Sequence, residues 1–202
     1  MFVDYSGSMC DIIEDVTNQA ITIAMFCRKV NIPFEVYSFT TSHWYGSELQ
    51  DDIEVKGNEL DDLTRIKVVE MFSGKMNKKT FDEAAFTSFA IAKAHSYNNR
   101  MKYHLSSHYL HPIDGMGSTP LIQTAMLASK ITKAFTRKHA IQNTNIMFLT
   151  DGYPDGISVI ENEKSDVETS REVMINFEGK MIRGNGAREI YKETLIRLKE
   201  LT

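Results

Sequence analysis

The spacing of apolar residues predicts an alternation of strands and helices along most of the chain. Phe2 and Val3 form a short apolar strand that ends at Asp4. Between residues 11 and 30, apolar side chains recur every three or four positions, which is the spacing of a helix with one buried face. Residues 34–39 are rich in β-forming side chains and predict a second strand. The order strand, helix, strand is that of a βαβ unit.

About residues 58–110, the chain is expected to be mostly helical and to form an insertion. Thr80 and Glu83 have the spacing of a capping box, in which the two side chains bond to free N–H groups at the start of a helix. Apolar residues then recur at helical spacing on one face, namely Phe81, Ala85, Phe89 and Ala92. Ahead of this insertion, residues 40–46 predict a turn and a short edge strand.

The second half of the chain returns to the alternation of helix and strand. Pro120 fits the first position of a helix with apolar residues at helical spacing. Residues 145–150 predict a buried strand, and residues 187–201 predict a final amphipathic helix. Residues 157–186 are hard to assign, because 173–182 could be strand or helix. The chain as a whole is therefore expected to be an α/β protein.

An oxygen-rich stretch follows the first predicted strand. It contains one carboxylate, Asp4, and two hydroxyls, Ser6 and Ser8, within five residues, with Gly7 allowing a sharp turn between the serines. Carboxylate and hydroxyl oxygens suit Mg²⁺ or Mn²⁺, which prefer octahedral oxygen coordination. Alone, the stretch is weak evidence, because Asp, Ser and Gly are also ordinary turn residues.

Two later segments place a further hydroxyl and a further carboxylate in loops. Thr119 lies in the sequence Gly-Ser-Thr-Pro-Leu ahead of a predicted helix, and Asp151 follows the predicted strand 145–150. Ligands of open α/β sheets bind at the carboxyl ends of the strands, which is where Asp4 and Asp151 are expected. Each segment also has an ordinary explanation, since Thr119 is a good helix N-cap and Asp151-Gly152 a simple turn.

Together and in this order, the three segments resemble the von Willebrand factor A (VWA) domain and its metal-ion-dependent adhesion site. The pattern is Asp-x-Ser-x-Ser, a distant Thr and an Asp after a hydrophobic strand, matched by Asp4, Ser6, Ser8, Thr119 and Asp151. The resemblance implies a single, doubly wound, Rossmann-like domain over residues 1–202, with a mostly parallel sheet and helices on both faces. It also implies Mg²⁺ (or Mn²⁺) held by these side chains, and a protein partner whose acidic side chain completes the coordination.

A closer resemblance involves residues 35–41, Glu-Val-Tyr-Ser-Phe-Thr-Thr, followed by Trp44. They look like a segment of the VWA domain in cobaltochelatase CobT-type subunits, and residues 58–63 resemble another element of that family. This implies an AAA+ ATPase as partner and a chelatase-like complex such as that of cobalamin biosynthesis. Similar single-domain proteins occur in large tailed phages, so a phage origin is also expected. By comparison with the family, the N-terminal and C-terminal strands are expected to be truncated.

Four residues are candidates for contact with the partner, namely Met9, Trp44, Gly117 and Asp155. Met9 and Gly117 adjoin the predicted metal ligands, although methionines more often fill a core. Trp44 is either part of an exposed aromatic patch or a cap on the core at the sheet edge. Asp155 either adds negative charge near the metal or is a solvated loop acid.

Composition narrows the classes of function. The 202 residues are 42% hydrophobic and 25% charged, with a net charge of −4, which gives no electrostatic reason to expect nucleic-acid binding. No apolar run approaches the ~20 residues needed to span a membrane. Cys10 and Cys27 fall on or beside one predicted helix, so we expect reduced thiols and a cytoplasmic protein, in the host cytoplasm if it is viral.

Other functions compete with metal-dependent binding. A metal-dependent hydrolase, a peptidase or phosphoesterase, would need a general base, for which Asp155 or a histidine would have to serve. His104, His108 and His111 have a spacing that suits zinc, but no His-Glu-x-x-His motif is present. Neither a Gly-x-Ser-x-Gly elbow nor a P-loop occurs, so the chain is expected to have no catalytic activity of its own. A structural or assembly protein is the third alternative.

Overall fold

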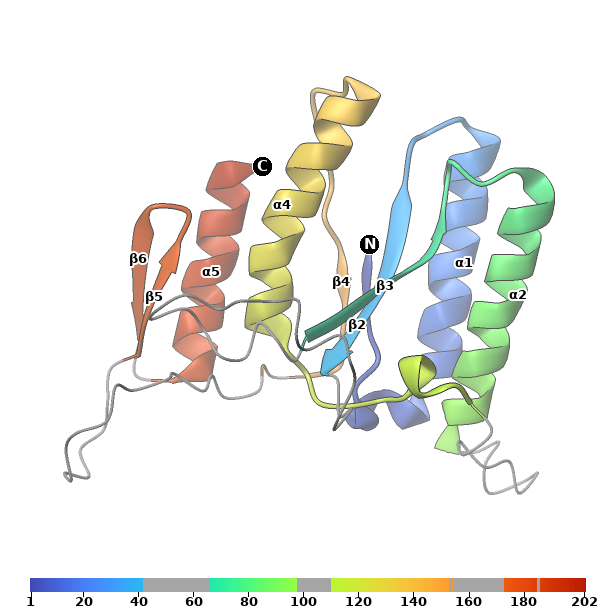
Figure 1. The fold of residues 1–202 in the computed structure, drawn as a ribbon, viewed down its shortest axis with the longest axis horizontal. Coiled ribbons are helices and arrows are strands. Elements are labelled where there is room, and N and C mark those ends of the chain that lie inside the picture. Colours follow the sequence, from blue (N-terminus) through green and yellow to red (C-terminus); the bar gives the residue numbers. More distant parts are fainter. Residues whose placement is uncertain (42–65, 98–109, 153, 155–172, 185) are drawn as a thin grey trace. The chain divides into compact units, whose positions relative to one another are not determined.

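The computed structural model describes most of the chain, namely residues 1–41, 66–97, 110–152, 154, 173–184 and 186–202. Trp44, Asp155, His104 and His108 lie outside the described residues, so the predictions made for them stay predictions. The chain forms two compact units, coloured along the sequence in Figure 1. The first consists of Met1–Ser42, Lys67–Thr119 and Asn145–Gly152, and the second of His43–Ile66, Pro120–Thr144 and Tyr153–Thr202.

A mixed four-stranded sheet is the centre of the first unit. Its strands lie in the order β3-β2-β1-β4 and span Phe2–Asp4 (β1), Glu35–Thr41 (β2), Ile66–Ser73 (β3) and Phe148–Leu149 (β4). Strand β1 is parallel to both of its neighbours, and Phe2 pairs with Tyr37 on β2 and with Phe148 on β4. The α/β class expected from the sequence is therefore confirmed.

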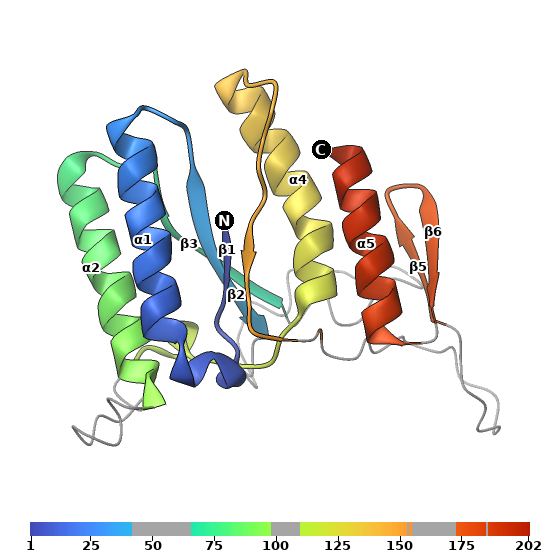
Figure 2. The same cartoon turned by 180° about the vertical axis from the view of Figure 1, so that it is seen from behind.

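Two helices of the first unit pack side by side along the sheet, α1 (Ile13–Lys29) and α2 (Lys78–His95) (Figures 1 and 2). They cover a core of fully buried side chains that includes Val3, Val36 and Phe72. The buried residues of α1 are Ile13, Thr17, Ala20 and Ala24. The predicted helix is confirmed, but its last apolar residue, Val30, is 44% exposed and lies beyond the helix.

The region 58–110, expected to be mostly helical, also contains a strand. Residues 66–73 form strand β3, which pairs with β2, and α2 supplies most of the helix in the described part of that region. The β-branched run of Ile66, Val68 and Val69 suits a strand. The predicted capping box is wrong, because helix α2 begins earlier and its N-cap is Asn77, whose side chain accepts a hydrogen bond from Thr80 N at 3.0 Å.

Strand β4 is shorter and less buried than the sequence predicts. It spans two residues, Phe148 and Leu149, both partly buried, and Met147 before them is 42% exposed. The aromatic ring of Phe148 on β4 nevertheless completes a row of rings on the sheet. The Phe2 ring stacks on Phe148 at 5.2 Å and on Tyr37 at 5.5 Å between ring centroids. This row ties β4 to β1 and β2 and fixes where the chain leaves the sheet before Asp151.

The second unit contains helices α4 (Leu121–His139) and α5 (Ala187–Leu201), which pack against each other, and a hairpin of β5 (Val173–Phe177) and β6 (Lys180–Gly184). The undecided segment 173–182 is thus a hairpin, and both predicted helices are confirmed. Its two-residue turn has φ of 47° at Glu178 and 83° at Gly179, as a type I′ turn requires.

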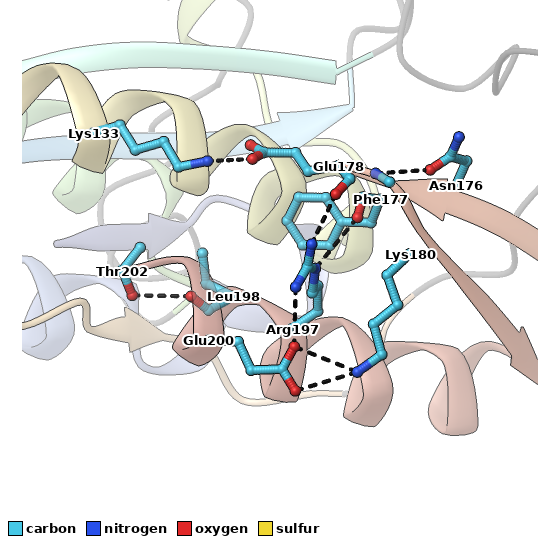
Figure 3. A network of polar contacts seen from close by, with 10 residues as sticks. Lys133, Asn176, Phe177, Glu178, Lys180, Arg197, Leu198, Glu200 and Thr202 are labelled. Atoms are coloured by element: carbon cyan, nitrogen blue, oxygen red, sulfur yellow. Dashed lines mark hydrogen bonds and ion pairs between the residues drawn. The ribbon is translucent and has the colours of Figure 1, made fainter.

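Polar contacts hold the unusual backbone of Glu178 in place (Figure 3). Its carboxylate pairs with Lys133 and accepts a hydrogen bond from Ser129 Oγ at 2.9 Å, both on α4. Arg197 on α5 donates to the Glu178 carbonyl oxygen at 2.7 Å and pairs with Glu200 at 3.1 Å. The pKa of Glu178 is lowered, chiefly by the bond from Lys133. Helices α4 and α5 therefore both bond to the same turn.

Among the described helices, none is long and apolar enough to cross a membrane.

Candidate metal centre

The carboxylate of Asp4 ends strand β1 at full burial, with 0% of the residue exposed. One of its oxygens, Oδ1, accepts a hydrogen bond from the backbone N–H of Ser6 at 2.9 Å. The other, Oδ2, accepts from the hydroxyl of Thr150 at 2.6 Å, across 146 residues of sequence. Each oxygen is thus fixed by a donor from a different loop, and the orientation of the carboxylate is set before any ligand binds.

A chain of side-chain oxygens leads from this buried position to the surface. Ser6 Oγ and Ser8 Oγ lie 3.1 Å apart, and Ser8 Oγ donates to Asp151 Oδ1 at 3.1 Å. Ser6 is buried, whereas Ser8 and Asp151 are exposed. The hydroxyls of Ser6, just before the short helix Gly7–Asp11, and of Ser8, within it, therefore join the loop after β1 to the loop after β4. Four of the five predicted metal ligands are thus connected. Ser6, Ser8 and Asp151 are linked through side-chain oxygens, and Asp4 is linked through the backbone N–H of Ser6.

The loop that carries Thr119 is joined to the same place by its backbone. Ser6 and Gly117 form a parallel β-bridge, in which Gly7 N donates to Gly117 O at 2.9 Å and Gly117 N to Tyr5 O at 3.3 Å. Thr119 follows two residues later and is 6% exposed. The fifth predicted ligand thus lies on a loop that is bonded directly to the segment containing Ser6.

Two threonines at the end of β2 fix this loop from the other side. Gly117 N donates to Thr40 Oγ1 at 2.9 Å, and Ser118 N donates to Thr41 Oγ1 at 2.8 Å. A Cβ atom on Gly117 would lie 2.5 Å from Thr41 O and 2.6 Å from Thr41 Oγ1. Glycine is required because no side chain fits between the loop and β2. The residue was predicted to contact a partner, and the structure gives it a packing role.

The electrostatics of the Asp4 carboxylate bear on whether the site could hold a cation. Burial raises the pKa of the Asp4 carboxyl above 3.8, hydrogen bonds from Thr150 and Ser6 oppose this, and the charge of Asp151 raises it further. Within the described part of the chain, neither carboxylate forms an ion pair with a lysine or arginine. Burial is the largest of these effects and the charge of Asp151 the smallest, and a divalent ion at this place would offset both.

The donor set also fits Mg²⁺ in spacing. Adjacent ligands of an octahedral Mg²⁺ lie about 2.9 Å apart, because each Mg–O bond is about 2.0–2.1 Å long. Two neighbouring oxygen pairs in the structure, Ser6–Ser8 and Ser8–Asp151, are each 3.1 Å apart. All the donors are hard oxygen atoms. Among the described residues, no group of three or more His, Cys, Asp or Glu side chains could hold a metal ion. His111, one of the three histidines considered for zinc, accepts a hydrogen bond at Nδ1 from Ile113 N in its own loop.

The structure gives one predicted residue a different environment and adds three residues that were overlooked. Met9, which is predicted to contact a partner, is 0% exposed and belongs to the core of the first unit. The overlooked residues are the threonines that orient the site, namely Thr40, Thr41 and Thr150. A signal was present in each case: every one of these hydroxyls lies at the carboxyl end of a strand, next to a predicted loop.

Comparison of the chain with known protein families, with curated proteins and with solved structures finds no match.

Proposed function

We propose that the chain is a divalent-metal-dependent protein-binding module of the VWA type, with Mg²⁺ or Mn²⁺ held by five residues of the first unit, Asp4, Ser6, Ser8, Thr119 and Asp151. The observation that carries this proposal is the chain of oxygens from Ser6 through Ser8 to Asp151, which joins side chains 143 residues apart. Ordinary turns and caps would satisfy their own local backbone and would not require this convergence.

The order of the strands supports a doubly wound fold of this type. The sequence β3-β2-β1-β4 is the first part of the order found in doubly wound sheets. Strands β2 and β4 lie on opposite sides of β1, and in a doubly wound sheet this arrangement would make the carboxyl end of β1 a ligand-binding switch point. Asp4 is the last residue of β1, so the predicted metal ligands would lie at that point.

The exposure of the residues supports binding of a partner rather than burial of a structural ion. Asp4 and Ser6 would hold the metal from the protein side, and Ser8 and Asp151 are open to solvent. A bound Mg²⁺ keeps some of its coordination positions for water or for an outside carboxylate. Thr150 and the N–H of Ser6 keep the Asp4 carboxylate oriented while that exchange takes place.

The resemblance of residues 35–41 to CobT-type subunits makes an AAA+ ATPase the partner that we propose, within a chelatase-like complex and in the cytoplasm. An acidic side chain of that partner would enter the exposed side of the site. The same resemblance motivates the link to cobalamin biosynthesis and to phage relatives.

The first test is calorimetric titration of the metal-stripped protein with Mn²⁺ and with Mg²⁺. We expect one site in the wild type, and at least a tenfold loss of affinity in Asp151→Asn, because one of the two charged ligands becomes neutral. Asp15→Asn is the matched control, since it makes the same change at an exposed position on α1. If the wild type binds neither ion, the oxygen cluster is only a set of turns and the proposed function fails with it.

The second test compares binding of the proposed partner class in Mg²⁺ and in EDTA. The wild type should retain an AAA+ ATPase in Mg²⁺ and release it in EDTA, and Asp151→Asn should not retain it in either buffer. Mg²⁺-dependent turnover of a phosphoester or peptide by the chain alone would instead support the hydrolase. Capture that is indifferent to EDTA would support a structural or assembly role.

A further inference from the structure

A cavity of about 360 Å³ lies in the first unit between strand β3 and helix α2. Its end is formed by residues 113–115, from the segment that leads to Gly117. Sites for small molecules generally have volumes of about 300–1,000 Å³, so the cavity is large enough for a small organic compound. The metal site uses none of the side chains considered below.

The cavity has mostly apolar walls and one half-buried cation. Val69, Ala84, Ile91 and Ile113 contribute to the walls. Lys67 on β3 lines the cavity, and its Nζ donates a hydrogen bond to the carbonyl oxygen of Gly115 at 2.7 Å. An ammonium group has three N–H donors, and within the described residues Gly115 O is the only acceptor that Lys67 reaches. The remaining donors are available to a ligand.

The charge of Lys67 is only partly compensated in the fold. Burial lowers the pKa of its ammonium group, and Asp114, also at the cavity, opposes that effect without forming an ion pair with it. Glu70 and Glu83 also line the cavity, and both are exposed to solvent. The Glu83 side chain is 65% exposed, and its carboxylate lies 3.8 Å from Lys79 Nζ. These carboxylates would repel a multiply charged anion such as a phosphate, whereas a single carboxylate could pair with Lys67.

We propose that this cavity binds a small monocarboxylic acid with an apolar body, whose carboxylate pairs with Lys67 Nζ and whose body lies against Val69, Ala84 and Ile91. A charged hydrogen bond to a half-buried ammonium gives the orientation, and the walls give the affinity. The ligand class follows from the single lysine in the lining, which can pair with one carboxylate, and from the apolar side chains beside it.

The position of the cavity couples it to the metal site, and this part rests on the proposed function. Tyr5 lines the cavity and lies between Asp4 and Ser6, while the Gly115 carbonyl held by Lys67 is two residues before Gly117. A carboxylate bound to Lys67 shares its ammonium group with the Gly115 carbonyl, and this competition weakens the bond that holds the loop. We expect an occupied cavity to weaken Mn²⁺ binding, and Mn²⁺ to weaken binding of the acid by the same factor.

The test is calorimetric titration with 4-phenylbutanoate, its amide and 4-phenylbutylamine, carried out in EDTA so that failure of the metal site cannot affect the result. The acid should bind at least tenfold more tightly than the amide, and the amine should not bind. Lys67→Met, which keeps the aliphatic stem, should abolish the difference between acid and amide. Ala84→Phe should remove binding by filling the cavity.

Equal binding of all three compounds, preference for the amine, or no binding of the acid would each overturn the proposal. The comparison of acid with amide is made on the wild type, so it does not depend on whether either variant folds. The coupling is measured afterwards, by repeating the Mn²⁺ titration with and without saturating acid.

Discussion

Replacement of Gly117 by alanine should destabilise the first unit and remove metal binding together. The added Cβ would lie 2.5 Å from Thr41 O, 2.6 Å from Thr41 Oγ1 and 3.0 Å from Thr40 Oγ1. The first two distances are shorter than real Cβ contacts, and one of the opposing atoms is a backbone oxygen of β2, which cannot rotate away. The loop must therefore move away from the strand.

The magnitude follows from what that movement breaks. Gly117 N and Ser118 N donate to Thr40 Oγ1 and Thr41 Oγ1 at 2.9 and 2.8 Å, and Gly117 O accepts from Gly7 N at 2.9 Å. Each such bond contributes about 0.5–1.5 kcal/mol net, and overpacking a tight site costs about 1–3 kcal/mol. Partial relaxation prevents both costs from applying in full, so we expect a loss of about 2–4 kcal/mol.

Urea denaturation measures the effect, and Gly152→Ala provides the control. Gly152 lies in the loop after β4, beside Asp151, and an added Cβ there would meet nothing within 4 Å. With a urea m-value of about 2 kcal/mol/M, the Gly117→Ala midpoint should fall by about 1–2 M and the Gly152→Ala midpoint should not change. Equal midpoints for the two variants would refute the reasoning. Gly117 would then be free of the strand, as a residue that serves only partner contact would be.

Two further predictions concern the orientation and charge of Asp4. Thr150→Val removes the hydroxyl that donates to Asp4 Oδ2 at 2.6 Å, and should weaken Mn²⁺ binding about 10–100-fold in calorimetry. Thr22→Val is the control and should leave Mn²⁺ binding unchanged, because the Thr22 hydroxyl bonds to a carbonyl on the exposed face of α1. Because burial raises the folded pKa of Asp4, the metal-free protein should lose stability as pH rises from 3.8 through that raised value. Asp4→Asn should remove this loss in EDTA and should no longer gain stability from Mg²⁺; equal pH dependence of the two urea midpoints would contradict the assignment.

Elements with a strong local signal were predictable from the sequence. Helix α5 has the predicted bounds, and β1 and β2 end close to where their apolar runs end. In each case one periodicity dominates the segment, so local preference and tertiary packing agree. The same holds for Asp4 and Asp151, which were placed after strands because a carboxylate rarely continues an apolar run.

Elements that depend on distant partners were not predictable. Strand β3 pairs with β2, more than twenty residues earlier in sequence, and its apolar residues fit a helix as well as an edge strand. The β5–β6 hairpin has a weak sequence signal, because its type I′ turn is Glu178-Gly179 rather than the more usual Asn-Gly or Asp-Gly. Lys133, Ser129 and Arg197 compensate for the positive φ of Glu178, and all three come from other elements.

The threonines of the candidate site show how much of it topology alone could have supplied. Once β2 and β4 are placed on either side of β1, the three strand ends must converge at Asp4. A hydroxyl at the end of β2 or β4 then has few neighbours except the loops that carry the predicted ligands. Thr40 bonds to the Thr119 loop, and Thr150 bonds to Asp4 itself. The hydroxyls that hold the predicted metal ligands in place are therefore as much a consequence of strand order as the positions of Asp4 and Asp151 are.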